Sequence, residues 1–125
     1  MPTEAQMKQA MQAYIDLFNK VDAAGIAELY ADDATVEDPV GSPLKKGKAE
    51  IRAFYEYAIK TGAKLSLAAP IRGSHGNAAA MAFDVNLKMP TGQAVIRVID
   101  VMTFTESGKF ASMKAYWGPG DMTPV

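Results

Sequence analysis

One carboxylate, Asp38, stands out as a group that could move a proton. It lies in the run ADDATVEDPVG, residues 31–41, and of the four carboxylates there only Asp38 directly precedes a proline. Pro39 disfavours the helical backbone region for Asp38, so we expect an extended backbone and a side chain aimed by a stiff turn at the mouth of an apolar cavity. The simpler alternative is that the Asp-Pro pair only starts a turn.

A second carboxyl, Asp100, lies within a strand that the alternation predicts over residues 95–104. Its own face of that strand carries Ile96, Val98, Met102 and Phe104, and the other face carries Arg97, Ile99, Val101 and Thr103. An unpaired carboxyl among apolar neighbours has a raised pKa and becomes a neutral hydrogen-bond donor. A slip by one residue, or a β-bulge, would instead turn Asp100 to solvent.

Three tyrosines, Tyr14, Tyr30 and Tyr55, fall on the apolar faces of three predicted helices. A buried tyrosine hydroxyl usually finds a partner, so we expect Tyr14 and Asp100 to donate to one common oxygen. Tyr30 and Tyr55 can form a hydroxyl chain behind Tyr14 that strengthens its donation. The alternative for Tyr30 and Tyr55 is that they are ordinary core tyrosines.

Apolar side chains on the other strands could complete a cavity. Met81 and Phe83 are two residues apart, and Met113 and Trp117 are four apart, so each pair shares one face of a strand. Each of these residues alone is typical of a core, but together they indicate a space for a flat apolar molecule.

The elements that position these groups follow from the hydrophobic periodicity. Helical spacing predicts helices over residues 3–20, 25–31 and 48–61, and alternation predicts strands over 34–37, 65–71, 79–87, 95–104 and 110–117. The tail from Gly118 is rich in glycine and proline, and we expect it to be loose. Helices followed by hairpin-linked strands favour an α+β fold with an antiparallel sheet curled around three helices.

Composition excludes several classes of function. The 125 residues predict one domain, over residues 1–125, and 13 basic against 14 acidic residues indicate neither a nucleic-acid surface nor a membrane patch. There is no cysteine, and the single histidine, His75, lies in a Gly-flanked turn where neither catalysis nor metal binding is expected. Lys45, Lys46 and Lys48 are expected to form a solvated rim. With neither a secretory signal nor a long apolar span, the expected location is the cytoplasm.

The outward face of the 95–104 strand is also apolar at Ile99 and Val101. A second covered face on an antiparallel strand indicates a partner subunit. We therefore expect a packed dimer, which a mass measurement in solution would test.

Several segments together resemble bacterial Δ5-3-ketosteroid isomerases. They are the run YADDATVEDPVG, the helix that carries Tyr14, the pair Phe54-Tyr55, the VID triplet ending at Asp100, and the AYW triplet ending at Trp117. The resemblance covers nearly the whole chain. It implies a cone-shaped, nuclear-transport-factor-2-like (cystatin-like) α+β fold, a homodimer, and migration of a steroid double bond from Δ5 to Δ4 without any cofactor.

The resemblance also implies roles for individual residues. Asp38 resembles the general base, Tyr14 the main oxyanion donor and Asp100 the second donor, and Tyr30 and Tyr55 resemble the supporting tyrosines. This family is itself a known case of a protonated aspartic acid beside a tyrosine in an oxyanion hole. The residues implied to line the steroid site are Met81, Phe83, Val98, Met102, Met113 and Trp117.

Two other interpretations remain open from the sequence. One is a different enzyme of the same fold, a polyketide cyclase, dehydratase or epoxide hydrolase, because one scaffold carries many reactions. Several of these use a His–Asp or Arg–Asp arrangement, which the turn position of His75 and the outward position of Arg97 disfavour. The other is a non-catalytic module for hydrophobic ligands, in which Asp38 and Asp100 would have unperturbed acidity.

Overall fold

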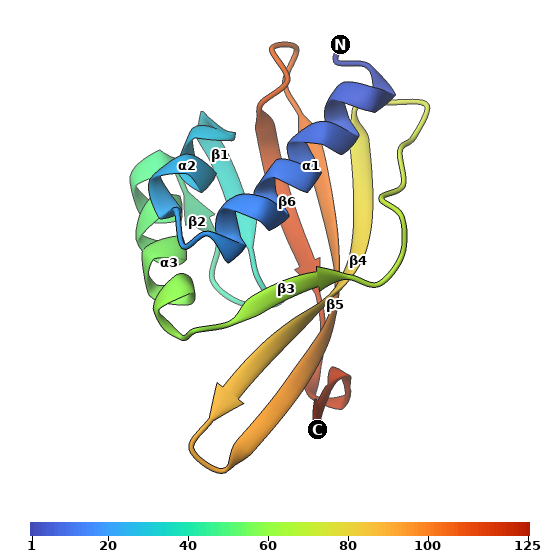
Figure 1. Ribbon diagram of the computed structural model, residues 1–125. Coiled ribbons are helices and arrows are strands. Elements are labelled where there is room, and N and C mark those ends of the chain that lie inside the picture. Colours follow the sequence, from blue (N-terminus) through green and yellow to red (C-terminus); the bar gives the residue numbers. More distant parts are fainter.

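The computed structural model describes residues 1–125 as three helices packed on one curved sheet (Figure 1). The helices are α1 (Glu4–Asn19), α2 (Ala23–Glu28) and α3 (Lys48–Lys60), with a 3-10 turn η1 (Pro119–Asp121) near the C-terminus. The strands are β1 (Tyr30–Glu37), β2 (Lys45–Lys46), β3 (Lys64–Leu67), β4 (Ala78–Met89), β5 (Gly92–Phe104), β6 (Phe110–Tyr116) and β7 (Met122–Pro124). The α+β class, with helices on a curved and mainly antiparallel sheet, is confirmed.

Helix α1 begins where the sequence predicts, because its N-terminus is fully capped. The Thr3 side chain accepts a hydrogen bond from the Gln6 backbone, and the Gln6 side chain accepts one from the Thr3 backbone. The apolar stripe of the helix then faces the sheet and buries Tyr14 among core residues. Helix α3 likewise buries Ile51 and Tyr55 and ends before Gly62, which has a φ of +78°.

The region between residues 21 and 37 differs from the prediction. Asp22 caps α2 by accepting a hydrogen bond from the Gly25 backbone, so the helix starts before Gly25 rather than at it. It also ends earlier, and β1 already begins at Tyr30. Tyr30 therefore reaches the interior from a strand and not from a helix, although its inward position was predicted correctly.

The sheet has the order β2-β1-β6-β5-β4-β3, with β7 added to β5. All neighbouring strands are antiparallel except β1 and β6, which run parallel. The parallel pair joins an N-terminal strand to the last long strand. Consequently the loop after β1 lies beside the end of β6, which places Asp38 near Trp117.

The long β4–β5 hairpin projects beyond the helices, as Figure 1 shows. Its register pairs Met81 with Asp100 and Phe83 with Val98. The tail after Gly118 is ordered rather than loose, because β7 pairs with β5 through Met122, Thr123 and Pro124. Three predicted strands also change length: β3 ends at Leu67, and β4 and β5 extend further into their shared turn.

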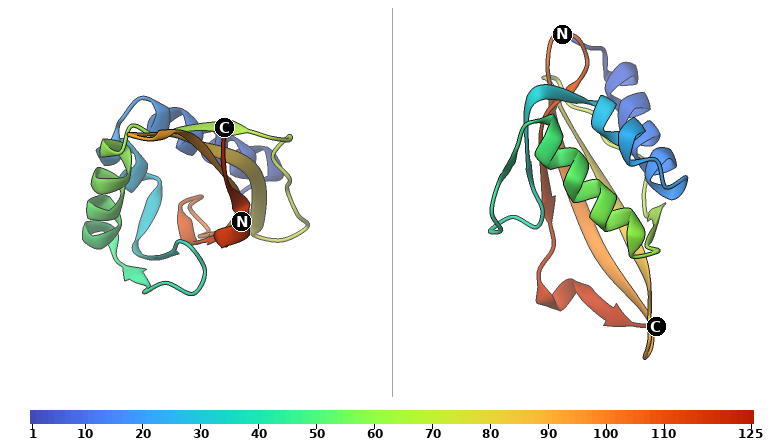
Figure 2. Two further views of the ribbon diagram at one scale, coloured as in Figure 1. Left: turned by 90° about the horizontal axis from the view of Figure 1, so that it is seen from below. Right: turned by 90° about the vertical axis from the view of Figure 1, so that its left-hand side faces the viewer.

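The core lies between the helices and the concave side of the sheet, and Figure 2 shows the sheet curving around this space. Twenty-five buried residues form one cluster there, including all three predicted interior tyrosines. None of the helices combines the length and the apolar character needed to cross a membrane.

Candidate active site

A cavity of about 350 Å³ opens between α1, α3 and the hairpin half of the sheet. Its lining is almost entirely apolar, and Asp38 and Thr61 are the two exceptions, while Tyr14 and Tyr55 bring aromatic rings that carry a hydroxyl. The lining residues are Tyr14, Phe18, Asp38, Phe54, Tyr55, Tyr57, Ala58, Thr61, Ala63, Leu65, Phe83, Val85, Leu87, Ile96, Val98 and Trp117. A pocket of this size with few polar groups is typical of a site for a small, largely hydrophobic molecule.

Asp38 is held at the cavity by the segment that follows β1. The Val40 backbone donates to the Ala115 carbonyl over 2.9 Å, which ties this segment to the end of β6. From there the Trp117 indole Nε1 donates to Asp38 Oδ1 over 3.1 Å. The Asp38–Pro39 peptide is cis. Asp38 thus occupies a turn and also lines the cavity, so both features expected of it occur together.

Burial raises the pKa of Asp38 above its ordinary value, because the surrounding apolar side chains remove water from the carboxylate. The hydrogen bond from Trp117 and the positive charge of Lys45 both lower the pKa and partly oppose this effect. The result is a carboxylate that is more basic than one in water but still has a donor fixed to one oxygen.

Asp100 is only 1% exposed and is the one charged residue type in the buried core. Neither of its carboxyl oxygens has a hydrogen-bond partner within the protein. Burial raises its pKa well above the ordinary value, and the nearby charge of Asp38 raises it further. The predicted alternation of β5 is confirmed, since Val98 and Met102 are buried beside Asp100 while Ile99 is 50% exposed.

The three interior tyrosines form a continuous hydroxyl chain. The Tyr30 and Tyr55 oxygens are 2.6 Å apart, and the Tyr55 hydroxyl donates to the Tyr14 oxygen over 3.1 Å. A hydroxyl has one proton, so Tyr55 uses its own on Tyr14 and must accept the proton of Tyr30. The hydroxyl proton of Tyr14 is therefore not used within the chain and can be donated to another group. Tyr14 lines the cavity.

Burial also raises the pKa of all three tyrosines well above the ordinary value. For Tyr14 the charge of Asp100 is the next largest cause, followed by that of Tyr30 and Asp38, while the hydrogen bond from Tyr55 lowers the pKa. Burial thus favours the protonated, neutral forms of the Tyr14 hydroxyl and the Asp100 carboxyl, and each of these groups can then donate a hydrogen bond.

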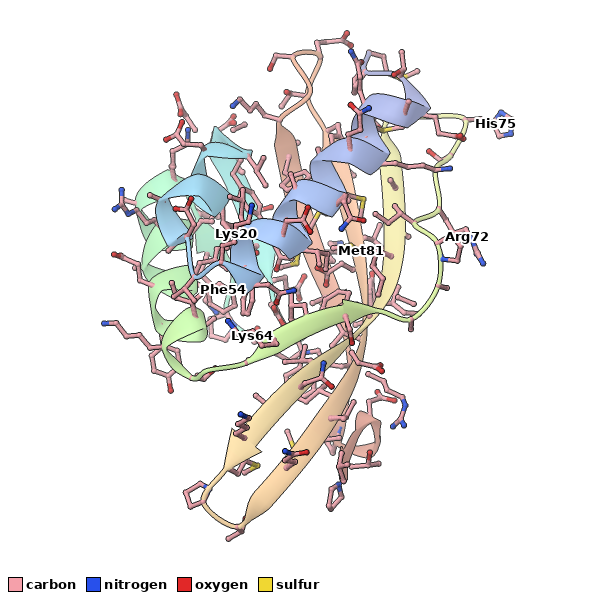
Figure 3. All side chains as sticks on the ribbon, in the orientation of Figure 1. Lys20, Phe54, Lys64, Arg72, His75 and Met81 are labelled. Carbon is pink, nitrogen blue, oxygen red and sulfur yellow. The ribbon has the colours of Figure 1, made fainter.

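The predicted steroid-lining residues divide into two groups. Phe83, Val98 and Trp117 line the cavity. Met81, Met102 and Met113 do not; they are at most 1% exposed and belong to the closed core. Figure 3 shows Met81 between α1 and the strands, whereas the cavity is lined by residues further along the hairpin, namely Phe83, Val85, Leu87, Ile96 and Val98.

Sequence reasoning missed several lining residues because their signals are ordinary. Phe54, Ala58 and Thr61 follow helical spacing on one face of α3, and that face could equally have packed against a closed core. Tyr57 lines the mouth although it is 74% exposed. The bond between Trp117 and Asp38 joins residues 79 positions apart and has no local signature.

Two further predictions concern charged side chains around the site. Figure 3 shows His75 on the loop before β4, pointing away from the body of the protein. Lys46 is exposed, as expected of a solvated rim, but Lys45 is half-buried and its ammonium lies 5.0 Å from the centre of the Phe54 ring. Lys48 is also half-buried and bridges Glu28 and Asp32, so of the three lysines predicted to form a solvated rim only Lys46 is exposed.

Comparison with known proteins gives this geometry a family context. Residues 11–113 match the SnoaL-like domain family. The chain is 44% identical over 119 residues to a steroid Δ-isomerase of Nocardioides simplex, and the match covers 94% of each chain.

Two relatives are more distant. The epoxide hydrolase LasB of Streptomyces lasalocidi is 25% identical over 98% of this chain and 51% of its own length. The structure of SalBIII, described as an epoxide hydrolase/cyclase-like enzyme in pyran ring formation in the polyether salinomycin, superimposes with a TM-score of 0.91 at 27% identity and full coverage of both chains. Because the family model matches residues 11–113 and the steroid Δ-isomerase is 44% identical, this chain belongs to the SnoaL-like family and, within it, to the ketosteroid isomerases.

Proposed function

We propose that the protein is a steroid Δ-isomerase that moves the double bond of a Δ5-3-ketosteroid to the Δ4 position. The observation that carries this proposal is one apolar cavity lined by Asp38 and Tyr14, with the unpartnered Asp100 carboxyl on the same face of β5 as the cavity-lining Val98. The 44% identity to a steroid Δ-isomerase of matching length supports the same reaction. The reaction consists of two proton transfers and needs no cofactor.

Asp38 is the proposed base. Its carboxylate removes a proton from carbon 4, and the electron pair of that C–H bond moves toward the carbonyl to form a dienolate. The carboxylic acid then returns the same proton to carbon 6 on the same face, which restores the carboxylate and leaves a conjugated enone. Burial supports this role, since a carboxylate of raised pKa is a stronger base toward a carbon acid.

Tyr14 and Asp100 are the proposed donors to the dienolate oxygen. Tyr14 has a spare proton because Tyr55 already donates to it, and Asp100 has no partner within the protein. Asp100 is not among the residues that line the cavity, so its proposed role requires the ketone oxygen to lie within reach of both the Tyr14 hydroxyl and the Asp100 carboxyl. Dry, preorganised donors at the site of developing charge are an effective way to lower such a barrier.

The test is an ultraviolet assay that follows formation of the conjugated enone from a Δ5-3-ketosteroid. Asp38→Asn should lower turnover at least ~10²-fold, within the usual range for a general base. Asp33→Asn is the matched control, because Asp33 lies in the same run but is exposed and forms no salt bridge. Absence of isomerisation by the wild-type protein, or near-normal turnover of Asp38→Asn, would reject the proposal.

The alternatives predict different results. An epoxide-opening enzyme, as the printed roles of LasB and SalBIII suggest for those proteins, would consume an epoxide and leave the steroid unchanged. A non-catalytic binding module predicts ordinary acidity for Asp38 and Asp100. Burial raises the pKa of both, which counts against the binding module.

We also propose a homodimer that covers the outer face of the sheet. Ile99 and Tyr116 pair across β5 and β6 on that face and are 50% and 48% exposed, so two apolar side chains lie next to each other in solvent. Sedimentation or light scattering gives the mass directly, and a monomer at assay concentrations would refute the dimer.

A further inference from the structure

Strand β2 consists of two lysines that point in opposite directions. Its register pairs Lys45 with Val36 and Lys46 with Thr35. Side chains paired across two strands share a face, and Val36 is fully buried, so Lys45 lies on the inner face of β1. Accordingly, Lys45 is half-buried and Lys46 is exposed.

The ammonium of Lys45 lies over the ring of a residue that lines the cavity. It lies 5.0 Å from the centre of the Phe54 ring and donates to the Pro43 carbonyl over 3.3 Å. Phe54 and Asp38 both line the cavity. A cation over an aromatic face is held by the ring quadrupole. By contrast with Lys48, which bridges Glu28 and Asp32, Lys45 forms no salt bridge that would neutralise its charge.

The other ionisable groups near Asp38 supply no competing positive charge. Asp100 comes from β5 and Tyr14 from α1, and burial raises the pKa of both, which favours their neutral forms. Tyr30 from β1 and Tyr55 from α3 stand behind Tyr14 and are neutral for the same reason. From the end of β6, Trp117 contributes an uncharged donor.

Two charged groups on the neighbouring strand segments, Glu37 and Lys114, point elsewhere. Glu37, the neighbour of Asp38 in the chain, turns its carboxylate to the Gly41 backbone. Lys114, opposite Glu37 on β6, is exposed. Lys45 is therefore the cation whose field acts on Asp38.

We propose that Lys45 is a positioning residue of the isomerase, whose ammonium, held over Phe54, favours the carboxylate form of Asp38 before and after each turnover. The proposal rests on the proposed function. In physical terms, burial raises the pKa of Asp38, and the positive charge of Lys45 lowers the pKa of that carboxyl. A base in a dry cavity gains basicity but risks remaining protonated, and a cation at the rim limits that risk without touching the substrate.

The experiment compares pH profiles of kcat/KM for Lys45→Met, Lys45→Arg and the control Lys46→Met. Methionine keeps the packing on Phe54 and removes the charge. On the acid limb we expect the kcat/KM of Lys45→Met to be about two- to fivefold lower than that of the wild type. This range corresponds to the effect of one partly screened charge beyond contact distance. At high pH, where Asp38 is ionised in both proteins, the loss should disappear.

The two other variants should follow the wild-type profile, since arginine keeps the charge and Lys46 faces solvent. A Lys45→Met profile identical to that of the wild type would overturn the proposal. The proposal would also be overturned if the acid limb of Lys46→Met moved as far as that of Lys45→Met. A uniform loss at every pH would indicate a purely structural role and would also overturn it.

A titration of the Asp38 side-chain carboxyl by carbon-13 NMR, in ligand-free wild type and Lys45→Met, separates this proposal from the proposed function. A higher pKa in Lys45→Met supports the charge effect even if no steroid is turned over, whereas equal pKa values overturn it even if the wild type isomerises steroids. A wild-type protein without isomerase activity would overturn the proposed function, and the titration would still decide whether Lys45 acts on Asp38.

Discussion

The hydroxyl chain predicts that two conservative Tyr→Phe changes, at Tyr55 and at Tyr30, have unequal costs. Tyr55 lies in the middle of the chain, accepting from Tyr30 and donating to Tyr14. Tyr55→Phe therefore removes two hydrogen bonds and leaves the buried Tyr30 hydroxyl without a partner. Tyr30→Phe removes one bond, and Tyr55 keeps its donation to Tyr14.

The number of hydrogen bonds that each variant loses sets the expected loss in the free energy of unfolding. Each buried hydrogen bond contributes about 1 kcal/mol net, and an orphaned buried hydroxyl costs about 1–3 kcal/mol. Tyr30 is completely buried, so no water can replace the lost partner of its hydroxyl, whereas Tyr14 lines the cavity. We expect Tyr55→Phe to lower the free energy of unfolding by about 2–4 kcal/mol and Tyr30→Phe by about 1 kcal/mol.

Urea denaturation followed by tryptophan fluorescence measures these differences. Tyr57→Phe is the matched control, because Tyr57 lies on the same helix, is 74% exposed and forms no hydrogen bond through its hydroxyl; it should change stability by less than about 0.5 kcal/mol. The double variant should cost less than the two single changes added together, since the orphaned hydroxyl is then gone. Equal costs for Tyr55→Phe and Tyr30→Phe would refute the middle position of Tyr55 in the hydroxyl chain.

Three further predictions concern the site. Tyr14→Phe should lower kcat on the order of 10²–10³-fold, as for loss of one oxyanion donor, and an unchanged rate would move that role to another group. Trp117→Phe removes a hydrogen bond that lowers the pKa of Asp38, so the acid limb of the kcat/KM profile should move to higher pH; an unmoved limb would show that this bond does not tune the base. The native state holds the proton of Asp100 more tightly than the unfolded chain does, so the free energy of unfolding should fall as pH rises from the ordinary aspartate pKa toward the raised native pKa. Asp100→Asn should flatten this slope in urea titrations at several pH values, and an equally steep slope in that variant would assign the effect to other groups.

The sequence was informative wherever a pattern is local. Helix α1 follows from its cap and its 3.6-residue stripe, and β5 follows from its alternation, which also placed Asp100 inside. It was less reliable around Tyr30, because a short helix and a strand start share the same apolar spacing over so few residues. The tail was predicted to be loose because its pairing partner, β5, is distant in the chain.

The identity of the groups that could act on a proton was thus readable from the chain itself, since residue type and backbone period dictate which polar side chains turn inward. The tertiary structure alone decided how those groups meet. It joined Trp117 to Asp38, set the order of the three tyrosine hydroxyls, and placed Lys45 over Phe54. It also put Met81, Met102 and Met113 in the closed core rather than on the cavity wall. The physical reason is that the boundary between core and cavity depends on where α1 crosses the sheet, and no local pattern along a single strand encodes that crossing.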